Sequence, residues 1–175
     1  VSLIKGAQAT TAIEGNTLTE EEIKKVDDGL KLPPSKKYQE IEVKNILDAL
    51  NTLLKEVTSE KKIKLISIEL IKRFNKMVGK NLGEHFEAIP GELRRHNVYV
   101  SNYKAPGYED IEELLKKFCD WSIEEFHFKK DQSFLDTIIQ AIVTHVYVVL
   151  IHPFGDGNGR TSRLLEFYIL LRAGN

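Results

Sequence analysis

The segment from Ile138 to Leu171 constrains the fold more than any other part of the chain. It starts with an uncharged, almost wholly apolar run from Ile138 to Ile151. A polar loop with glycines at 155, 157 and 159 follows, and a second, mostly apolar stretch runs from Leu164 to Leu171. A polar, glycine-spaced loop between two buried segments is characteristic of a functional site rather than of a linker.

The first apolar run requires a choice between strand and helix. Its Ile and Val content favours a strand, and a strand leading into a glycine loop would indicate a dinucleotide-binding α/β fold. Asp136–Ile151, however, has 16 residues, which is the length of a helix, and no strand–helix alternation surrounds it. We therefore predict a buried central helix, capped by Ser133, in an all-α helical bundle with one small β-hairpin. On this helix, His145 and Tyr147 are interpreted as core residues.

Capping residues and apolar residues at three- and four-residue spacing predict further helices. Thr19 and Glu22 form a capping box for a helix that ends near Gly29. Other helices are predicted over residues 1–13, 36–56, 60–78 and 108–125, with Ser59 as the cap of the third. These elements give one domain with a substantial core.

The loop from His152 to Arg163 carries the groups of a phosphate-binding site. Alternating glycines let backbone N–H groups approach an anion closely. The helix expected to begin near Asn158 or Gly159 directs its positive end at the same point. Arg160 and Arg163 are three residues apart, so they share a helix face, and each can bind phosphate in bidentate fashion.

Asp156 and His152 add a metal ligand and a base to this loop. Asp156 is a hard oxygen ligand suited to Mg²⁺, which takes one or two carboxylates plus substrate phosphates. His152 titrates near neutral pH, as a general base needs, and Pro153 ends the preceding helix at this histidine. Phe154 should anchor the loop in the core. Since the spacing differs from P-loop and dinucleotide-binding motifs, these residues predict phosphoryl or nucleotidyl transfer.

The sequence from His152 to Arg163 resembles the signature of the Fic family, His-Pro-Phe-x-Asp/Glu-Gly-Asn-Gly-Arg-x-x-Arg, at every defining position. The resemblance implies a single Fic-type bundle over residues 1–175, which transfers AMP from ATP to a Ser, Thr or Tyr hydroxyl of a target protein. It implies His152 as the catalytic base and Asp156 as the Mg²⁺ ligand. The nucleotide-binding residues that it implies are Phe154, Gly155, Gly157, Asn158, Gly159, Arg160 (β-phosphate) and Arg163 (γ-phosphate).

A second motif near the N-terminus resembles another feature of that family. Thr10-x-x-x-Glu14-Gly15 is similar to its inhibitory motif, Ser/Thr-x-x-x-Glu-Gly/Asn. The resemblance implies that residues 1–16 form an inhibitory helix, in which Glu14 pairs with Arg163 and obstructs binding of the γ-phosphate. A carboxylate in the anion position competes with phosphate for the same guanidinium. In some family members the same glutamate positions water to remove AMP, so de-AMPylation is a second implied activity.

Residues 93–105 are predicted to form a turn and a small hairpin. Val98 and Val100 lie on one side of the strand and Tyr99 on the other. In the Fic family a Gly-x-x-Arg segment, here Gly91–Arg94, and a hairpin called the flap lie at this place. The flap holds the target backbone as an added strand. From these residues alone, an ordinary small hairpin is the alternative.

Composition narrows the partners and the compartment. Lys plus Arg number 25 and Asp plus Glu 26, so the net charge of −1 gives no support for nucleic-acid or membrane-surface binding. The apolar run 138–151 is too short and too polar to span a bilayer, and we expect no membrane partner. Cys119 is the only cysteine, which fits a reducing compartment, and we expect a cytoplasmic protein. The sequence starts without Met and ends at Asn175, so we expect an excerpt of a longer chain. A homodimer is compatible with the sequence.

Three alternatives stay open beside adenylyl transfer. An inactive nucleotide-binding or interaction module has no physical need of the intact His152 and Asp156. In the branch of the wider family that transfers the γ-phosphate, the Gly-Asn-Gly segment is replaced, whereas this sequence keeps it at 157–159. Transfer of UMP or phosphocholine uses similar signatures, so the reaction type is predicted more firmly than the nucleotide.

Overall fold

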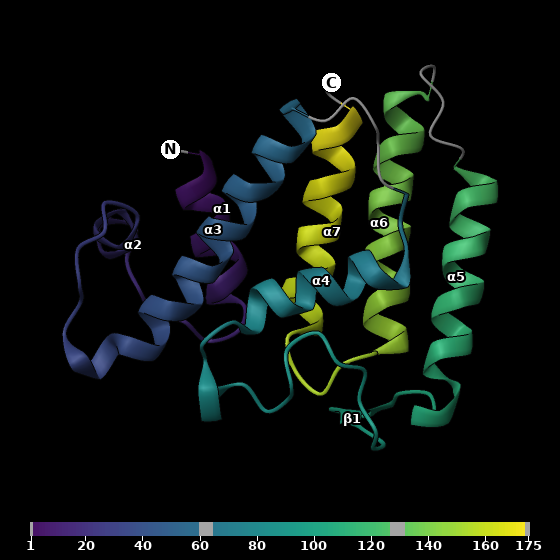
Figure 1. Cartoon of the computed structure of the whole chain (residues 1–175), viewed down its shortest axis with the longest axis horizontal. Helices are drawn as coiled ribbons and strands as arrows, with labels where there is room; N and C mark the ends of the chain where they lie inside the picture. Colours follow the sequence, from purple (N-terminus) through teal and green to yellow (C-terminus); the bar gives the residue numbers. More distant parts are fainter. Residues whose placement is uncertain (1, 60–64, 127–131, 174–175) are drawn as a thin grey trace.

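The computed structural model describes residues 2–59, 65–126 and 132–173. Over these residues the chain is a bundle of α-helices with one small β-hairpin, as predicted (Figure 1). The α-helices are α1 (Ser2–Ala12), α2 (Glu20–Asp27), α3 (Lys37–Ser59), α4 (Ile68–Gly79), α5 (Ile111–Glu125), α6 (Phe134–Ile151) and α7 (Asn158–Ala173). The hairpin strands are β1 (Tyr99–Val100) and β2 (Tyr103–Lys104), and short 3₁₀ turns lie at Pro34–Lys36, Gly83–His85 and Tyr108–Asp110.

Two predicted caps are present at the starts of α2 and α6. Thr19 Oγ1 accepts from the N–H of Glu22 at 3.3 Å, and the Glu22 carboxylate accepts from the N–H of Thr19 at 3.1 Å, which completes the capping box. Ser133 Oγ accepts from the N–H of Asp136 at 3.1 Å. The central run is therefore a helix and not a strand, as its length predicts.

The helix predicted over 60–78 starts later than expected. It is α4, and its cap is Ser67, which accepts from the N–H of Leu70 at 3.2 Å. Ser59, the predicted cap, is the last residue of α3 and its hydroxyl donates back to the carbonyl of Lys55 at 2.5 Å. A serine can donate to a carbonyl of the preceding turn in its own helix as well as cap the next helix. Residues 60–64 lie outside the described part of the chain.

The two helices that flank the glycine loop form the centre of the bundle. α6 and α7 lie side by side and antiparallel, and α4 crosses them (Figure 1). α5 lies on the outer side of α6, whereas α1 and α3 lie on the other side of α7. Since the connection from α6 to α7 is the loop 152–157, the loop is held at one end of the bundle.

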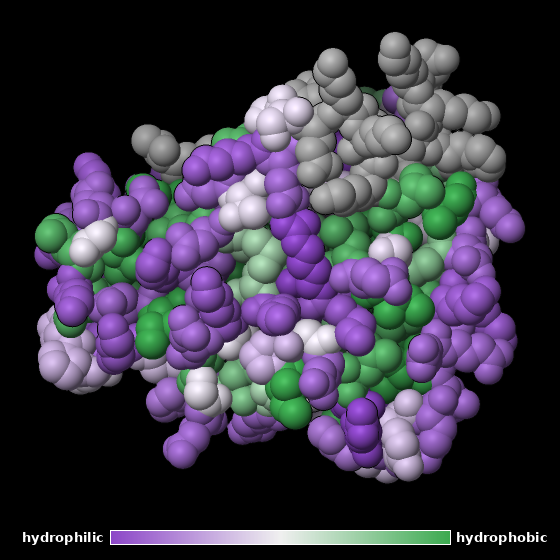
Figure 2. Space-filling view, in the orientation of Figure 1, coloured by the Kyte–Doolittle hydropathy of each residue, from purple (hydrophilic) through white to green (hydrophobic). Residues whose placement is uncertain are grey.

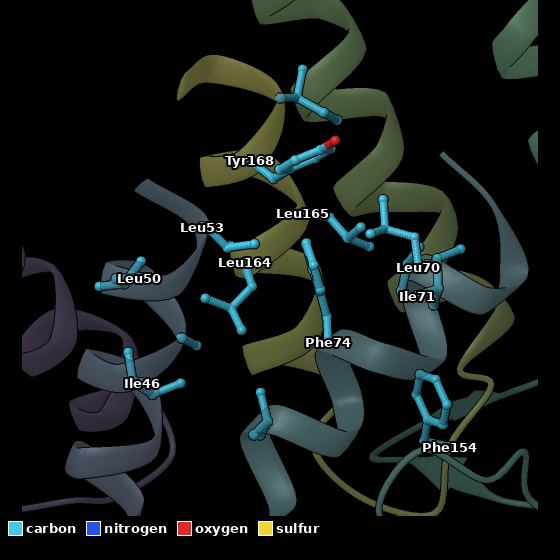
Figure 3. Packing of buried hydrophobic residues seen from close by; sticks show 14 of the residues in the cluster. Ile46, Leu50, Leu53, Leu70, Ile71, Phe74, Phe154, Leu164, Leu165 and Tyr168 are labelled. Carbon is cyan, nitrogen blue, oxygen red and sulfur yellow. The ribbon is translucent and has the colours of Figure 1, made fainter. Parts of the chain in front are cut away.

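The core lies where α3, α4 and α7 meet. Figure 3 shows Phe74 of α4 directed toward Leu164, Leu165 and Tyr168 of α7, and its ring meets that of Tyr168 edge to face at 5.7 Å between centroids. Phe154 from the glycine loop is fully buried in the same cluster. Burying a side chain of this size stabilises the fold by about 1.5–3 kcal/mol, so the loop is attached to the core.

The prediction that α6 is buried is wrong for much of its surface. Only 33% of its 18 residues are buried. Half of the buried residues are polar: the six are Thr137, Gln140, Ala141, Thr144, Val148 and Ile151. The exposed stripe is apolar: Phe134, Leu135, Ile139, Ile142 and Val146. Tyr147, predicted as a core residue, is 44% exposed. Figure 2 shows hydrophobic residues gathered on the surface over α5 and α6.

The apolar surface of α6 bears on two other predictions. By length and composition alone α6 would suffice to cross a membrane, a test that core helices of soluble proteins also pass. The absence of a membrane partner therefore stays a prediction. His145 is satisfied as expected, since its Nδ1 lies 2.8 Å from Oε2 of Glu166 on α7, although both side chains are only partly buried.

Candidate active site

His152 lies at the C-terminal end of α6, as the proline after it predicts. It is the C-cap residue, with φ 50° and ψ 59° in the left-handed region. Non-glycine residues seldom take this conformation, so neighbouring groups must hold it. Its N–H donates to the carbonyl of Val148 at 3.0 Å, and its carbonyl accepts from Nε of Arg94 at 2.7 Å. These contacts fix the imidazole at the entrance of the loop.

The half-buried imidazole of His152 is suited to act as a base. Its Nδ1 lies 3.3 Å from the carbonyl oxygen of Val149. A carbonyl oxygen only accepts, so this contact favours the tautomer with hydrogen on Nδ1 and an unprotonated Nε2. Burial lowers the pKa of His152 below its usual 6.5; Arg94 lowers it further, whereas the Val149 carbonyl and Asp156 act in the opposite direction. The imidazole is therefore neutral near pH 7.

Two of the predicted nucleotide-binding residues brace the loop from within. Phe154 is 0% exposed, and its side chain anchors the loop in the core as predicted. Asn158, which is 3% exposed, accepts from the N–H of Phe154 at 3.0 Å and donates to the Phe154 carbonyl at 2.9 Å. The two residues thus close the loop on itself, and their predicted part in nucleotide binding stays a prediction.

Gly157 allows the loop to pass close to α4. It has φ 76°, and a Cβ at this position would lie 3.0 Å from the Phe86 ring and 3.1 Å from Nδ2 of Asn75. Asn75 on α4 donates to the carbonyl of Asp156 at 2.9 Å and accepts from the N–H of Gly91 at 2.8 Å. A side chain at 157 would displace these groups, so the glycine serves packing as well as the turn.

Asp156 keeps an accessible carboxylate at the surface of the loop. Its side chain is 25% exposed. Oδ1 accepts from the N–H of Gly157 and from Nη2 of Arg160, the latter at 3.0 Å, and Oδ2 accepts from the N–H of Glu87 at 3.2 Å. The neighbouring Gly155 is also partly exposed. These contacts orient the carboxylate without enclosing it.

Arg160 and Arg163 are both on α7, but their guanidinium groups have different surroundings. Arg160 is 3% exposed and forms ion pairs with Glu42 of α3 and with Asp156. Burial raises the pKa of the Glu42 carboxyl, and the hydrogen bond from Asn16 and the charge of Arg160 oppose that rise. Arg160 is therefore an internal part of the site, and its expected role at the β-phosphate stays a prediction.

Arg163 is the more accessible arginine, with a side chain that is 20% exposed. It forms an ion pair with Glu14, as the resemblance implied. Its Nε donates to Oγ1 of Thr10 and its Nη2 to the Thr10 carbonyl, the latter at 3.2 Å. Gly15, with φ 89°, follows Glu14 in the turn that ends this segment. Thr10, Glu14 and Gly15 thus lie together at the C-terminal end of α1, beside α7.

The carboxylate of Glu14 lies against the first turn of α7. A Cβ on Gly159 would lie 2.7 Å from Oε1 of Glu14 and 3.1 Å from Nη1 of Arg163. The N-terminal end of a helix attracts anions through its free N–H groups and its dipole. We call this position, formed by Gly159, Arg163 and the first turn of α7, the anion seat. The seat is taken by a carboxylate of the same chain.

The predicted hairpin is present and lies near His152. β1 and β2 are antiparallel, with Val100 opposite Tyr103, and each strand has two residues, so the hairpin is shorter than the predicted 93–105 span. Tyr99 is 68% exposed and Val100 is also exposed, whereas Val98 is partly buried. The hydroxyl of Tyr103 donates to the carbonyl of Leu150, near the end of α6, at 2.9 Å.

Residues 65–170 match the sequence profile of the Fic/DOC family. The chain belongs to the Fic/DOC family. Proteins named protein adenylyltransferase Fic from Nematostella vectensis and Drosophila willistoni are 36% and 31% identical to this chain over 94% of its length. The structure of Fic-1 from C. elegans is similar, with a TM-score of 0.71 and 32% identity over 94% of the chain. A Fic domain containing signaling protein from Bacteroides thetaiotaomicron, 23% identical with a TM-score of 0.77, shares the fold.

These relatives are longer than the chain described. It spans 36% and 31% of the two adenylyltransferases, and 46% and 60% of the two solved chains. The profile match begins at residue 65, so α1–α3, with Glu14 and Glu42, precede it. The match covers the glycine loop and the hairpin of this Fic domain.

Sequence reasoning missed three buried polar residues of the Fic domain: Glu42, Asn75 and Arg94. Arg94 is 5% exposed, and its guanidinium donates to the carbonyls of His152, His96 and Pro106. It thereby joins the end of α6 to both ends of the hairpin segment. The Gly-x-x-Arg pattern marked its position but not its partners, which lie up to 58 residues away in sequence.

Proposed function

We propose that this Fic domain transfers AMP from ATP to a hydroxyl group of a target protein. The family membership supports this, as do relatives named protein adenylyltransferase that match 94% of the chain. The observation that carries the proposal is the geometry of the loop between α6 and α7. A neutral histidine stands at one end of it and an anion seat with an arginine at the other.

In the proposed reaction Nε2 of His152 accepts the proton of the acceptor hydroxyl. The hydroxyl oxygen forms a bond to the α-phosphorus of ATP, the bond from this phosphorus to the α,β-bridging oxygen breaks, and pyrophosphate leaves with the electron pair. Arg163 and the first turn of α7 would bind the γ-phosphate. Arg160, held between Glu42 and Asp156, would stabilise the charge that develops on the β-phosphate.

Mg²⁺ is the proposed cofactor. Among residues 2–59, 65–126 and 132–173, no group of three or more His, Cys, Asp or Glu side chains is arranged to hold a metal ion. Mg²⁺ commonly uses one or two carboxylates together with substrate phosphates. Asp156, accessible and in the loop, would be the protein ligand. The ion would neutralise charge on the phosphates.

Glu14 is proposed to inhibit this reaction. Its carboxylate pairs with Arg163 and lies against Gly159, where the γ-phosphate is expected. Carboxylate and phosphate compete for one guanidinium and one helix end. ATP that binds around Glu14 would lack its γ-phosphate contact, so its α-phosphate would not face His152 correctly.

The hairpin is proposed to act as the flap that presents the acceptor. Its exposed residues, Tyr99 and Val100, lie in β1, and main-chain groups of a two-stranded hairpin are available to a further strand. Recognition through the main chain depends little on the target sequence. The hairpin is joined to α6 through Arg94 and Tyr103, which would keep the acceptor beside His152.

The test uses ATP labelled in the α-phosphate, Mg²⁺ and the Glu14→Gly variant, with a cell lysate as the source of acceptors. We expect Glu14→Gly to label itself or lysate proteins at least about tenfold more than the wild type. Adding His152→Ala to that background should abolish labelling while ATP still binds. Binding of ATP by Glu14→Gly without transfer to any acceptor would instead support a nucleotide-binding module.

A further inference from the structure

Glu42 is the most deeply buried of the carboxylates that pair with Arg160 or Arg163. It is 1% exposed and lies on α3, between the apolar residues Ile41 and Val43. Carboxylates are almost never buried to this extent unless they are paired. Here one oxygen accepts from Nη1 of Arg160 and the other accepts from Nδ2 of Asn16 at 2.8 Å. Each partner leads to a different part of the site.

The first oxygen of Glu42 fixes the guanidinium of Arg160. With Nη1 on Glu42 and Nη2 on Asp156 at 3.0 Å, the planar group has one defined orientation. Its Nε is buried without a hydrogen-bond partner among the described residues. The orientation of Arg160 relative to the loop therefore depends on a residue 118 positions away. A lost Glu42 charge would leave Arg160 paired with Asp156 alone.

The second oxygen of Glu42 holds the turn that carries Glu14. Asn16 is 7% exposed and follows Glu14 by two residues. Its amide also donates to the carbonyl of Gln39 at 3.1 Å, and its Oδ1 accepts from the N–H of Leu18 at 3.0 Å. These bonds attach the turn after α1 to α3, so that Glu14 reaches Arg163.

We propose that Glu42 is a positioning residue for both the transfer reaction and its inhibition. One of its oxygens orients Arg160 toward the phosphates, and the other, through Asn16, holds Glu14 in the anion seat. The proposal rests on the proposed adenylyl transfer. It predicts opposite effects in two backgrounds: a loss of Glu42 weakens inhibition when Glu14 is present, and it slows transfer when Glu14 is replaced.

The transfer arm is measured in the Glu14→Gly background with ATP as the varied substrate. Glu42→Gln keeps the size of the side chain and removes its charge. We expect kcat/KM for ATP to fall by about tenfold, mainly through KM, because the charged hydrogen bond to Arg160 is lost. Glu40→Gln is the matched control: Glu40 is a buried carboxylate of the same helix that accepts from the N–H of Leu32 at 2.8 Å. It should change kcat/KM less than twofold.

A double-mutant cycle separates positioning from general stability. With Arg160→Met already present, Glu42→Gln should have less than a further twofold effect on kcat/KM, since the group that it orients is gone. A purely structural role would lower kcat/KM again by the same factor. Melting temperatures of all variants show whether each is folded under the assay conditions.

The inhibition arm keeps Glu14 in place. Asn16→Ala, which keeps both Glu42 and Arg160, should raise basal transfer above that of the wild type. Added to Glu14→Gly, Asn16→Ala should raise transfer no further, and it should lower kcat/KM less than Glu42→Gln does. Equal ATP affinity and equal kcat/KM for Glu14→Gly with and without Glu42→Gln would overturn the proposal. If Glu14→Gly transfers no AMP at all, the proposed function fails, and calorimetric ATP affinity of the same variant pair then decides whether Glu42 positions Arg160.

Discussion

Replacing Arg94 by Met tests whether one buried guanidinium holds the flap and the end of α6 together. Arg94 is 5% exposed and donates to three main-chain carbonyls, those of His152, His96 and Pro106, at 2.7, 2.6 and 2.7 Å. Methionine has a similar length and keeps the apolar packing, but it donates no hydrogen bond. The variant therefore removes these three bonds together with a positive charge that lowers the pKa of His152.

The expected loss of stability follows from these contacts. A hydrogen bond from a charged donor contributes roughly 1.5–3 kcal/mol. If the three bonds were fully additive, their sum would be about 5–9 kcal/mol. The energies of neighbouring hydrogen bonds are not additive. Carbonyl groups near the loop that lose Arg94 also form hydrogen bonds with water instead. We therefore expect the free energy of unfolding to fall by about 3–5 kcal/mol, because each buried carbonyl left without a donor costs about 1–3 kcal/mol. For a chain of 175 residues this lowers Tm by roughly 10 °C.

Arg95→Met is the matched control, because Arg95 is adjacent and exposed. Its expected effect is within about 0.5 kcal/mol. Urea and thermal unfolding followed by circular dichroism measure both variants. A Tm for Arg94→Met within about 2 °C of the wild type would refute the reasoning. If the variant is folded at the assay temperature, we also expect its transfer rate to fall, because His152 loses the contact that holds its left-handed backbone.

Three further predictions concern single groups. In the Glu14→Gly variant the transfer rate should fall as the pH is lowered, with a midpoint below pH 6.5. Burial lowers the pKa of His152, and only the neutral imidazole accepts a proton. A midpoint above pH 6.5 would contradict this. Burial raises the pKa of Cys119 to about 12, so a thiol reagent at about pH 8 should label it in urea and not in the native protein, and fast native labelling would count against its burial. Adding Gly159→Ala to Glu14→Gly should weaken ATP binding, measured by calorimetry, by about tenfold. The new Cβ would lie 3.1 Å from Nη1 of Arg163 and fill part of the anion seat. An unchanged ATP affinity would show that the seat lies elsewhere.

The features that the sequence predicted correctly are those encoded by neighbouring residues. The caps at Thr19 and Ser133 act over three residues. The glycine loop and the start of α7 at Asn158 lie within one short stretch, so their chemistry is visible as a motif. The pair of Glu14 with Arg163 spans 149 residues, and it was anticipated only through the resemblance to a family.

The features that were missed depend on distant parts of the chain. Glu42 and Arg160 are 118 residues apart, and Asn75 and Asp156 are 81 apart. The sequence held only a weak signal for Glu42, because the polar and charged neighbours Glu40, Lys44 and Asn45 do not mark the segment as apolar. The exposure of α6 was missed for a related reason. An apolar sequence shows that a helix can be buried, but only the neighbouring helices decide which of its sides is covered.

The most direct measurement follows both products of ATP in the Glu14→Gly variant. The protein is incubated with Mg²⁺, an acceptor found by labelling, and ATP labelled either in the α- or in the γ-phosphate. Adenylyl transfer predicts that the α-label appears on the acceptor and that one pyrophosphate is released for each AMP attached, with neither product formed by the His152→Ala variant. Label on the acceptor from γ-labelled ATP, with ADP as the released product, would contradict the proposed function of the loop from His152 to Arg163.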